Sequence, residues 1–492
     1  MTARRVPLPA AGALAAGCLE VWLAHRTSGP GGILERRYGL LGLIGAWTGA
    51  YAVAVVCVLR LPVRWALTFV LLLAVVLRLA AISPKAPLSD DLYRYAWDGV
   101  VQTHGIDPYR HPPVAGELRH LRDPWLFPPG QKTNAGTQIN RPAVRTIYPP
   151  VAEAWFTAVH LVVPMSTRDR GYEGVGFVVD LAVLAVLLSL LRDRRWIALY
   201  ALAPLPVLEV VQNAHVDGLA VLLTLGAVAL SERRRPNSGV VLLALATLTK
   251  IYPVLLLPLL LRERGTRVRR SALFAAVCIA AYLPHVLAVG TAIAGYLPGY
   301  LREENYGAGT RYVLVGLLGL HGPAASVVVL LALAGLGIWV LRSRLPLPEA
   351  ALRLMAGALL LVTPVQPWYA VLLLALATLA RAWWAVPLTV AAYPLFFAAV
   401  LDGDTVLVGR LAYATALLVL VGLAGWLRVA GQLHPLGVGP ACRDDHLPTG
   451  PGRGQGGVEG LALMPEGQVP AGGHQPDGAL RPGEDLRGER GR

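Results

Sequence analysis

Long runs of apolar residues recur along most of this chain, and they leave few folds open to it. Runs of about 18 or more apolar residues are long enough to cross a bilayer as helices. Only 15% of the residues are charged and the mean hydropathy is +0.54, which is far from the balance of a soluble domain. Residues 1–430 are therefore expected to form an all-α integral membrane bundle of about twelve to fourteen transmembrane helices.

Polar segments interrupt this bundle at two places. The longer one covers residues 83–148, and a loop of this length is expected to carry function rather than to serve as a connector. A second polar loop covers residues 291–311. The tail, residues 431–492, is rich in Gly and Pro and almost free of aromatic residues, which predicts disorder.

The formal net charge is +14, but the basic residues are spread over short loops between apolar runs, where they anchor helices at lipid headgroups. Nucleic acid is therefore not an expected partner. The four cysteines lack the spacing of a metal site or a disulfide framework. The positive-inside rule leaves the orientation open. The basic pair Arg4–Arg5 favours a cytoplasmic N-terminus, but counting spans from there puts both the pair Arg36–Arg37 and the basic residues of 192–195 outside.

The most informative polar stretch is SDDLYRYAWDG, which follows the third apolar run and ends at Gly99. Ser89 is expected to cap a helix that begins at Asp90. Asp90 and Asp91 then lie in the first turn, where the helix dipole tolerates negative charge. The helix would be about 15 residues long and would lie along the membrane surface.

The faces of this helix follow from its periodicity. Positions 91, 95 and 98 share one face, and Asp90 is expected to face Arg94 one turn on. An apolar face, turned toward lipid or protein, is made by Leu92, Ala96 and Val100.

This stretch has the residue types that sugar transfer needs. A carboxylate within reach of a sugar hydroxyl can act as a general base, arginine can hold the phosphate of a leaving group, and aromatic rings offer flat faces to a pyranose or an isoprenoid chain. The alternative is a capped interfacial helix whose acidic side chains only interact favourably with the helix dipole and with nearby arginines. Further cations in the same loop favour the chemical interpretation; they are Arg110, His111, Arg141 and Arg145.

Polar residues also interrupt the apolar sequence at Asn213, His215 and Asp217. Polar groups at membrane depth are costly and are therefore candidates for function, although a wet turn between two short helices would explain them equally well. His215 with Asp217 makes only a weak metal-binding pattern. Lys250, deep in an apolar run, needs a partner, which is either a donor phosphate or an acid such as Asp180 or Asp217. The alternative for Lys250 is snorkelling from a helix end.

Gln366, Trp368 and Tyr369 open a late apolar run. An aromatic belt at the membrane interface is the usual explanation for such residues, and contact with a sugar or a lipid chain is the other.

Taken in order, several stretches resemble GT-C membrane glycosyltransferases. The resemblance is to bacterial polyprenol-phosphate-dependent mannosyltransferases, namely the glycosyltransferase family 87 group and the related α-(1→6)-mannopyranosyltransferases. It covers residues 83–374 and is carried by SDDLYRYAWDGVVQTHGIDPYRHPP, TIYPPVAEAWF, NAHVDGLAVLL, LATLTKIYPVLLLP and TPVQPWYAVLLL.

The resemblance implies a lipid-linked sugar donor, inversion at the anomeric carbon, and a catalytic acid in the first large external loop. The catalytic base then falls on Asp90 or Asp91, and the donor phosphate on Arg94, Arg110 and Lys250. Residues expected to contact substrate are Tyr93, Tyr95, Trp97, Asp98, His215, Asp217, Gln366, Trp368 and Tyr369. The known members have one helix before the motif, whereas this chain has three apolar runs there, so the family's helix numbering does not transfer.

The resemblance also implies partners and a location. The expected partners are a polyprenyl-phosphate sugar, a lipid-linked glycan acceptor and membrane lipid. The expected sugar is a hexose, with mannose as the first choice. No cofactor is required, and a divalent metal is compatible with the sequence. The protein is expected to be multi-pass in the cell membrane, with its catalytic loop on the extracytoplasmic side.

Two other functions fit a polytopic chain. A transporter or lipid-carrier flippase would use ionisable residues as a path at mid-membrane, but here the richest polar cluster lies in an interfacial loop. A structural membrane subunit would tolerate replacement of the acids without loss.

Overall fold

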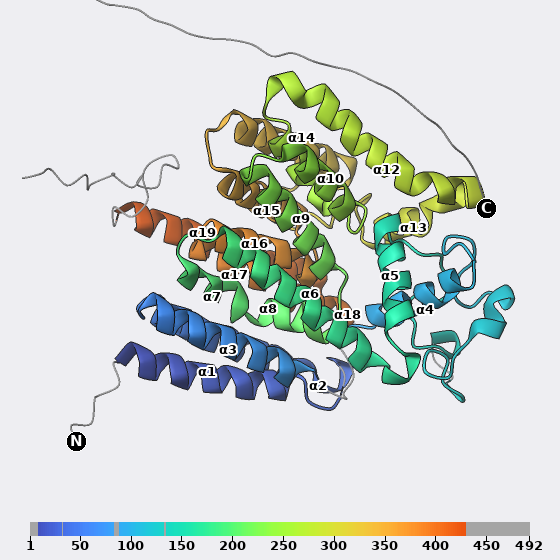
Figure 1. Ribbon diagram of the computed structural model, residues 1–492, viewed down its shortest axis with the longest axis horizontal. Coiled ribbons are helices and arrows are strands. Elements are labelled where there is room, and N and C mark those ends of the chain that lie inside the picture. The colour runs from blue at the N-terminus through green and yellow to red at the C-terminus, as the bar shows by residue number, and fades with distance from the viewer. Residues whose placement is uncertain (1–7, 32, 83–87, 132–133, 430–492) are drawn as a thin grey trace, which may run out of the picture. The chain divides into compact units, whose positions relative to one another are not determined.

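The computed structural model describes residues 8–31, 33–82, 88–131 and 134–429, and every regular element in this part of the chain is helical (Figure 1). This confirms the predicted all-α polytopic fold. Among the described residues, 8 helical segments are long and apolar enough to cross a membrane, and a bent pair, 204–212 with 217–232, would bring the number to 9. The predicted disordered tail, 431–492, lies outside the described residues.

The expected number of twelve to fourteen spans is not reached in the described part of the chain, because proline and polar residues break several apolar runs into short helices. The run 239–261 forms α10 (Pro236–Thr247), a 3₁₀ turn η6 (Tyr252–Leu256) and the short α11 (Leu257–Leu260). The run 149–164 forms only α5 (Pro150–Val162). Its 13 residues measure about 20 Å, too short for a hydrocarbon core of about 30 Å.

The remaining helices fall into long and short sets. The long helices are α1 (Leu8–Thr27), α2 (Ile33–Leu59), α3 (Val63–Ala81), α6 (Asp169–Leu190), α12 (Arg267–Val289), α14 (Gly322–Arg342) and α19 (Thr405–Val429). The short ones are α4 (Asp91–Thr103), α7 (Ala198–Ala201), α8 (Pro204–Pro206), α9 (Asp217–Glu232), α13 (Leu297–Glu303), α15 (Leu347–Val362), α16 (Ala370–Leu379), α17 (Val386–Val390) and α18 (Ala392–Val400), with a π-helical turn η5 (Val207–Gln212).

A buried ion pair ties two of the long helices together. Arg78 of α3 donates to Asp180 of α6, and neither side chain is exposed at all. Tyr200 donates its hydroxyl hydrogen to the same carboxylate over 2.7 Å. Large apolar side chains are exposed on the outer faces of the spans, for example Ile279 and Leu330, as contact with lipid requires.

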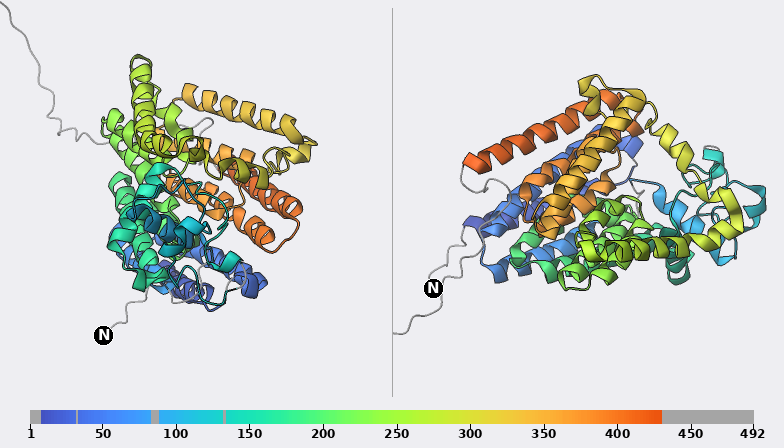
Figure 2. Two further views of the ribbon diagram at one scale, coloured as in Figure 1. Left: turned by 90° about the vertical axis from the view of Figure 1, so that its right-hand side faces the viewer. Right: turned by 90° about the horizontal axis from the view of Figure 1, so that it is seen from above.

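The segment that carries the acid pair lies at one end of the long helices, beside α5 and α13 (Figure 1; Figure 2). Its main helix, α4, begins at Asp91 and has 13 residues. The helix was expected to begin at Asp90 with Ser89 as its cap, but the N-cap residue is Asp90, which makes no side-chain capping hydrogen bond. Ser89 lies one residue earlier, and its Oγ accepts the N–H of Asp91 over 3.3 Å. The apolar face of α4 turns to protein rather than to lipid, because every residue from 92 to 101 is buried.

Arginine-rich turns gather at the opposite end of the long helices. Arg195, just after α6, donates to the carbonyl of Leu59 at the end of α2 over 3.0 Å. Arg262 likewise donates to the carbonyls of Val340 and Leu345. Because α5 is too short to cross, α6 runs from the end that holds α4 to the end that holds residue 195. Counting α5 as a span explains the conflict at residues 192–195 in the sequence-based orientation. It does not explain the conflict at Arg36–Arg37, which lie near the start of α2, beside residues 33–35 of the cavity wall.

Candidate active site

A cavity of about 1290 Å³ lies where the segment 88–148, α13 and the ends of several helices meet. This volume exceeds the usual range for small-molecule pockets and leaves room for an extended ligand. One part of its wall is polar and includes Asp90, Asp91, Asn140, Arg141, Arg145, Tyr148, Lys250, Glu303, Glu304, Arg311 and Gln366. Another part is apolar and includes Val254, Leu255, Met355, Ala358, Leu359, Val362, Phe396 and Ala399.

Asp90 and Asp91 lie at the start of α4 and share one donor. The Nδ2 group of Asn140 donates to Oδ1 of Asp90 over 3.2 Å and also to Oδ1 of Asp91. Asp91 accepts two further hydrogen bonds at Oδ2, from the hydroxyls of Tyr148 over 3.2 Å and Tyr95 over 3.5 Å. Asp91 is therefore held on several sides, whereas Asp90 is exposed toward the cavity.

The surroundings of Asp90 change its acidity. Desolvation by the cavity walls, followed by the charge of Asp91, raises the pKa of Asp90 to about 6. The walls crowd this carboxylate without covering it, because the side chain itself stays exposed. A carboxylate with a pKa nearer to neutrality is a stronger base than an ordinary one and is still ionised at pH 7.

The second polar loop reaches the same cavity through α13. Arg141 binds Glu303 with two nitrogens, Nε at 3.1 Å from Oε2 and Nη2 at Oε1, and Tyr296 also donates to this carboxylate. The chain passes close to Thr146 just before α13. A Cβ on Gly295, which has φ +51°, would lie 1.9 Å from the Thr146 carbonyl oxygen. Only glycine fits there, so the loops 88–148 and 291–311 are packed together at the cavity.

A buried arginine forms a second polar cluster on the wall. Arg311 Nη2 lies 2.7 Å from Oε2 of Glu304, and Gln366 donates to Oε1 of the same carboxylate over 2.8 Å. Thr363 fixes the arginine's backbone, because its Oγ1 donates to the Arg311 carbonyl over 2.8 Å.

Lys250 has the acid partner that its burial requires. Its Nζ lies 3.0 Å from Oδ2 of Asp217, and it lies 5.1 Å from the ring centre of Tyr148 and 5.9 Å from that of Tyr369. Of the two acids expected from the sequence, Asp217 is the partner, since Asp180 is bound to Arg78.

Five of the predicted site residues line the cavity together with the acid pair and Lys250; they are Tyr93, Arg94, Gln366, Trp368 and Tyr369. The expected pairing of Arg94 with Asp90 is wrong. Arg94 Nε instead lies 3.0 Å from both oxygens of Asp98, and its Nη1 donates to the Val144 carbonyl over 3.2 Å. The buried interior supplies an acid at the same helical spacing on the other side, where pairing is not weakened by water.

Other predicted residues lie away from the cavity wall. Trp97 is buried against Phe127, with ring centres 5.1 Å apart. Asp98 is buried with Arg94. Arg110 donates to the Ala288 carbonyl over 3.1 Å, at the C-terminal end of α12. Tyr95 reaches the site only through its hydroxyl on Asp91.

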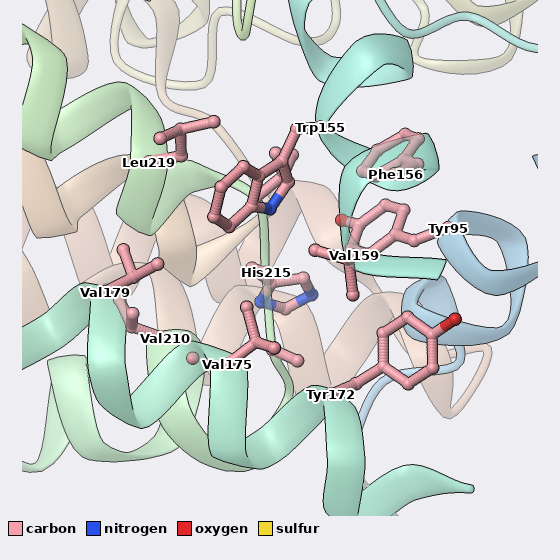
Figure 3. Close-up of a pocket in the computed structure, with 13 residues that line it drawn as sticks. Tyr95, Trp155, Phe156, Val159, Tyr172, Val175, Val179, Val210, His215 and Leu219 are labelled. Carbon is pink, nitrogen blue, oxygen red and sulfur yellow. The ribbon is translucent and has the colours of Figure 1, made fainter. Parts of the chain in front are cut away.

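His215 lies directly behind the acid pair. Its Nε2 is 3.0 Å from Ser89 Oγ and 3.8 Å from Oδ2 of Asp91, and its ring centre is 4.0 Å from that of Trp368. Figure 3 shows His215 at a second pocket, among side chains of α4, α5 and α6 that include Tyr95, Trp155 and Tyr172. That pocket holds about 20 Å³, enough for one water molecule and far too little for a sugar.

The described residues contain no group of three or more His, Cys, Asp or Glu side chains that could hold a metal ion. The two residues of the weak metal-binding pattern have separate partners in the structure. His215 contacts Ser89, and Asp217 pairs with Lys250.

Several residues of the site were not found from the sequence. Asn140, Tyr148 and Arg311 occupy ordinary positions in a loop or beside an apolar run, and their contacts join distant segments. Asn140 is 50 residues from Asp90, and Arg311 is 55 residues from Gln366. A polar residue inside an apolar run was a usable sign for Glu209, as it was for Asn213 and His215.

The fold and the cavity together define a polytopic membrane protein with a large cavity that is lined by both polar and apolar side chains. The sequence model of glycosyltransferase family 87 matches residues 146–364. Over these residues the chain is similar to that family, which confirms the resemblance found in the sequence and supports a membrane glycosyltransferase. No curated protein and no solved structure matches the chain. Since the matched stretch begins after the acid pair, the roles of Asp90 and Asp91 rest on geometry.

Proposed function

We propose that this glycosyltransferase moves a hexose, mannose in the first instance, from a polyprenyl phosphate to a hydroxyl group on a lipid-anchored glycan of the cell envelope. The observation that carries the proposal is the acid pair at the polar side of a cavity of about 1290 Å³ whose other side is apolar. The polar side suits a sugar and a phosphate, and the apolar side, lined by α15 and α18, suits an isoprenoid chain.

The proposed reaction inverts the anomeric carbon in one step. Asp90 takes the proton of the acceptor hydroxyl, and the acceptor oxygen bonds to the anomeric carbon on the face opposite the phosphate. The bond between that carbon and the phosphate oxygen breaks, and polyprenyl phosphate leaves with the electron pair. Asp90 is the preferred base because it is open to the cavity with a pKa raised to about 6, whereas Asp91 is held by Asn140 and two tyrosines.

Lys250 is the proposed ligand of the leaving phosphate. It lines the cavity and sits between two aromatic rings. Lys250 and Arg94 each have an acid partner, Asp217 and Asp98, but Arg94 also donates to the Val144 carbonyl. The third cation expected in this role, Arg110, does not line the cavity. Arg145 and Arg311, which do line it, are better placed to assist. No cofactor is invoked.

We propose that the site faces the extracytoplasmic side. At the end of the long helices away from α4, basic residues occupy successive turns; they are Arg60, Arg64, Arg192, Arg194, Arg195, Arg233, Arg234, Arg235, Arg262, Arg264, Arg267, Arg269 and Arg270. The other end of α12 contacts the segment 88–148 through His285 and Asp107, whose Nδ1 and Oδ2 atoms lie 2.7 Å apart. Short basic loops stay in the cytoplasm, which supports an external position for Asp90.

The test is a transfer assay with purified protein in detergent or nanodiscs. Wild-type protein is incubated with polyprenyl-phosphate mannose and an oligomannoside acceptor, in parallel with polyprenyl-phosphate glucose, and product is followed by mass spectrometry. We expect transfer from the mannose donor. Transfer from glucose alone would correct the sugar, and no transfer from any polyprenyl-phosphate donor would overturn the proposed function.

A further inference from the structure

Glu209 is a buried acid to which the catalytic chemistry assigns no part. It lies in the π-helical turn η5 and is 3% exposed. Its Oε2 accepts the side-chain N–H of Asn213 over 3.0 Å and lies 3.1 Å from Nδ1 of His215. Its Oε1 accepts the hydroxyl of Tyr393 over 2.8 Å. One carboxylate therefore holds the Asn213 side chain by a hydrogen bond and lies against the ring of His215, and both residues are on the turn that follows it.

Those two side chains hold the residues just before the acid pair. Asn213 Oδ1 accepts the backbone N–H of Leu88 over 2.9 Å. His215 Nε2 lies 3.0 Å from Ser89 Oγ, and the same oxygen accepts the N–H of Asp91. His215 therefore lies between the two, with Nδ1 against the Glu209 carboxylate on one side of the ring and Nε2 within hydrogen-bonding distance of the Ser89 hydroxyl on the other. The contacts run without a break from Glu209 to the first turn of α4.

We propose that Glu209 is a positioning residue for the acid pair, acting through Asn213 and His215 on the entry to α4; the inference rests on the proposed function. Asp90 and Asp91 lie at the exposed start of a short helix, where the backbone frays unless it is held. A carboxylate in the bundle interior that anchors this entry at both Leu88 and Ser89 keeps the base in line with the acceptor hydroxyl. Misplacement of about 1 Å can lower a rate by about 100-fold.

The test compares two substitutions of Glu209. Glutamine keeps the shape and can place its oxygen toward Asn213 and His215 while its amide donates to Tyr393, whereas alanine removes every contact. We expect Glu209→Ala to lower kcat by about 10- to 100-fold with an unchanged KM for the donor, and Glu209→Gln to stay within about threefold of wild type. The matched control is Glu20→Ala, since Glu20 is an equally buried glutamate on α1 that contacts Trp47 and lies away from the cavity.

Activity is normalised to folded protein, and backbone amide exchange is read at Leu88 and Asp91. Faster exchange at both amides in Glu209→Ala, but not in Glu209→Gln or Glu20→Ala, supports the inference. The inference is overturned if Glu209→Ala keeps the wild-type kcat and the wild-type amide exchange rates. It is also overturned if kcat falls as far in Glu209→Gln or in Glu20→Ala as it does in Glu209→Ala. If wild-type protein transfers no sugar, the proposed function fails, and unchanged exchange in Glu209→Ala would then separately overturn the anchoring.

Discussion

Asp90 and Asp91 are neighbours in sequence but have different surroundings, and this difference makes their roles testable. We expect Asp90→Asn to lower kcat by about 100- to 10,000-fold, the usual contribution of a general base, with little change in the KM of the donor. The asparagine keeps the shape and the contact with Asn140 but cannot take a proton. Initial rates of transfer with saturating acceptor measure the effect.

The control for this substitution is Asp402→Asn. Asp402 is an exposed aspartate in the turn after α18 and does not line the cavity. It should keep wild-type kcat. An Asp90→Asn variant as active as this control would remove Asp90 from the mechanism.

The pKa of Asp90 predicts the acid side of the pH–rate profile. A base works only when deprotonated, and the pKa of this carboxyl is raised to about 6. We therefore expect kcat/KM to be flat above that pH and to fall about tenfold per pH unit below it. In Asp91→Asn the neighbouring charge that helps to raise the pKa is gone, so the fall should begin at lower pH. A profile whose acid limb does not move in that variant would contradict the assignment of Asp90.

Part of this site followed from local sequence alone. The start of α4 was predicted to within one residue, because the hydrogen bond from the Asp91 N–H to Ser89 and the proximity of Asp90 and Asp91 depend on residues within one turn. The partner of Arg94 did not follow, because an acid lies on either side at comparable spacing and only burial decides between them. Asn140 and Arg311 were missed because their partners belong to distant segments.

The crossing of α4 and α5 sets a strict limit on side-chain size. A Cβ on Gly99 would lie 2.6 Å from the Phe156 carbonyl oxygen and 2.8 Å from the His160 Cβ. We expect Gly99→Ala to destabilise the protein by about 1–3 kcal/mol, as overpacking does, because α4 must move away from α5. Thermal unfolding in detergent measures this.

Gly45→Ala on α2 is the matched control, since nothing lies within 4 Å of a Cβ built there. It should leave stability unchanged or raise it slightly, because alanine favours helix more than glycine does. Equal melting temperatures for the two variants would mean that α4 and α5 are not closely packed.

The ion pair between Arg141 and Glu303 joins the two polar loops at the cavity. Both side chains are about half exposed, 45% and 42%, so the pair adds at most about 1 kcal/mol. We expect Arg141→Glu to raise the donor KM by up to about fivefold, with little effect on stability, because the loops separate. The exchanged pair, Arg141→Glu with Glu303→Arg, should recover most of this loss. A donor KM in the double variant that stays as high as in Arg141→Glu would show that Arg141 does not act through Glu303.

Short helices account for most of the difference between the expected and the observed bundle. Apolar runs identified α1, α2, α3, α6 and α19 well because these helices have few internal breaks. The apolar runs gave too many membrane spans where a run contains prolines, as between α10 and α11. Hydropathy alone does not indicate the residue at which a helix ends. The π-helical turn η5 and the 116° bend after it have no periodicity that a sequence pattern reveals.

The orientation of the chain in the membrane can be tested directly. After the native cysteines are replaced by alanine, we expect a cysteine at Gly116 to react in intact cells with a membrane-impermeant thiol reagent. A cysteine at Gly265 should react only after the cells are permeabilised. Both glycines are exposed, with nothing within 4 Å of a Cβ, and they lie toward opposite ends of α12. Reaction at Gly265 alone in intact cells would place Asp90 in the cytosol and end the proposed mechanism.

The pair of Arg78 and Asp180 has a consequence for how the protein is made. The two residues are 102 positions apart, and Asp180 lies in the middle of α6. A lone charge at the centre of a bilayer costs about 2.5–3.5 kcal/mol at the translocon. When α3 leaves the ribosome, α6 has not yet been synthesised, so α3 has no counter-ion. Arg78 lies in the last turn of α3, from which a long side chain can reach the interface while it waits, whereas Asp180 in the middle of α6 has no such escape. We therefore expect α6 to enter lipid paired with an α3 that is already in the membrane.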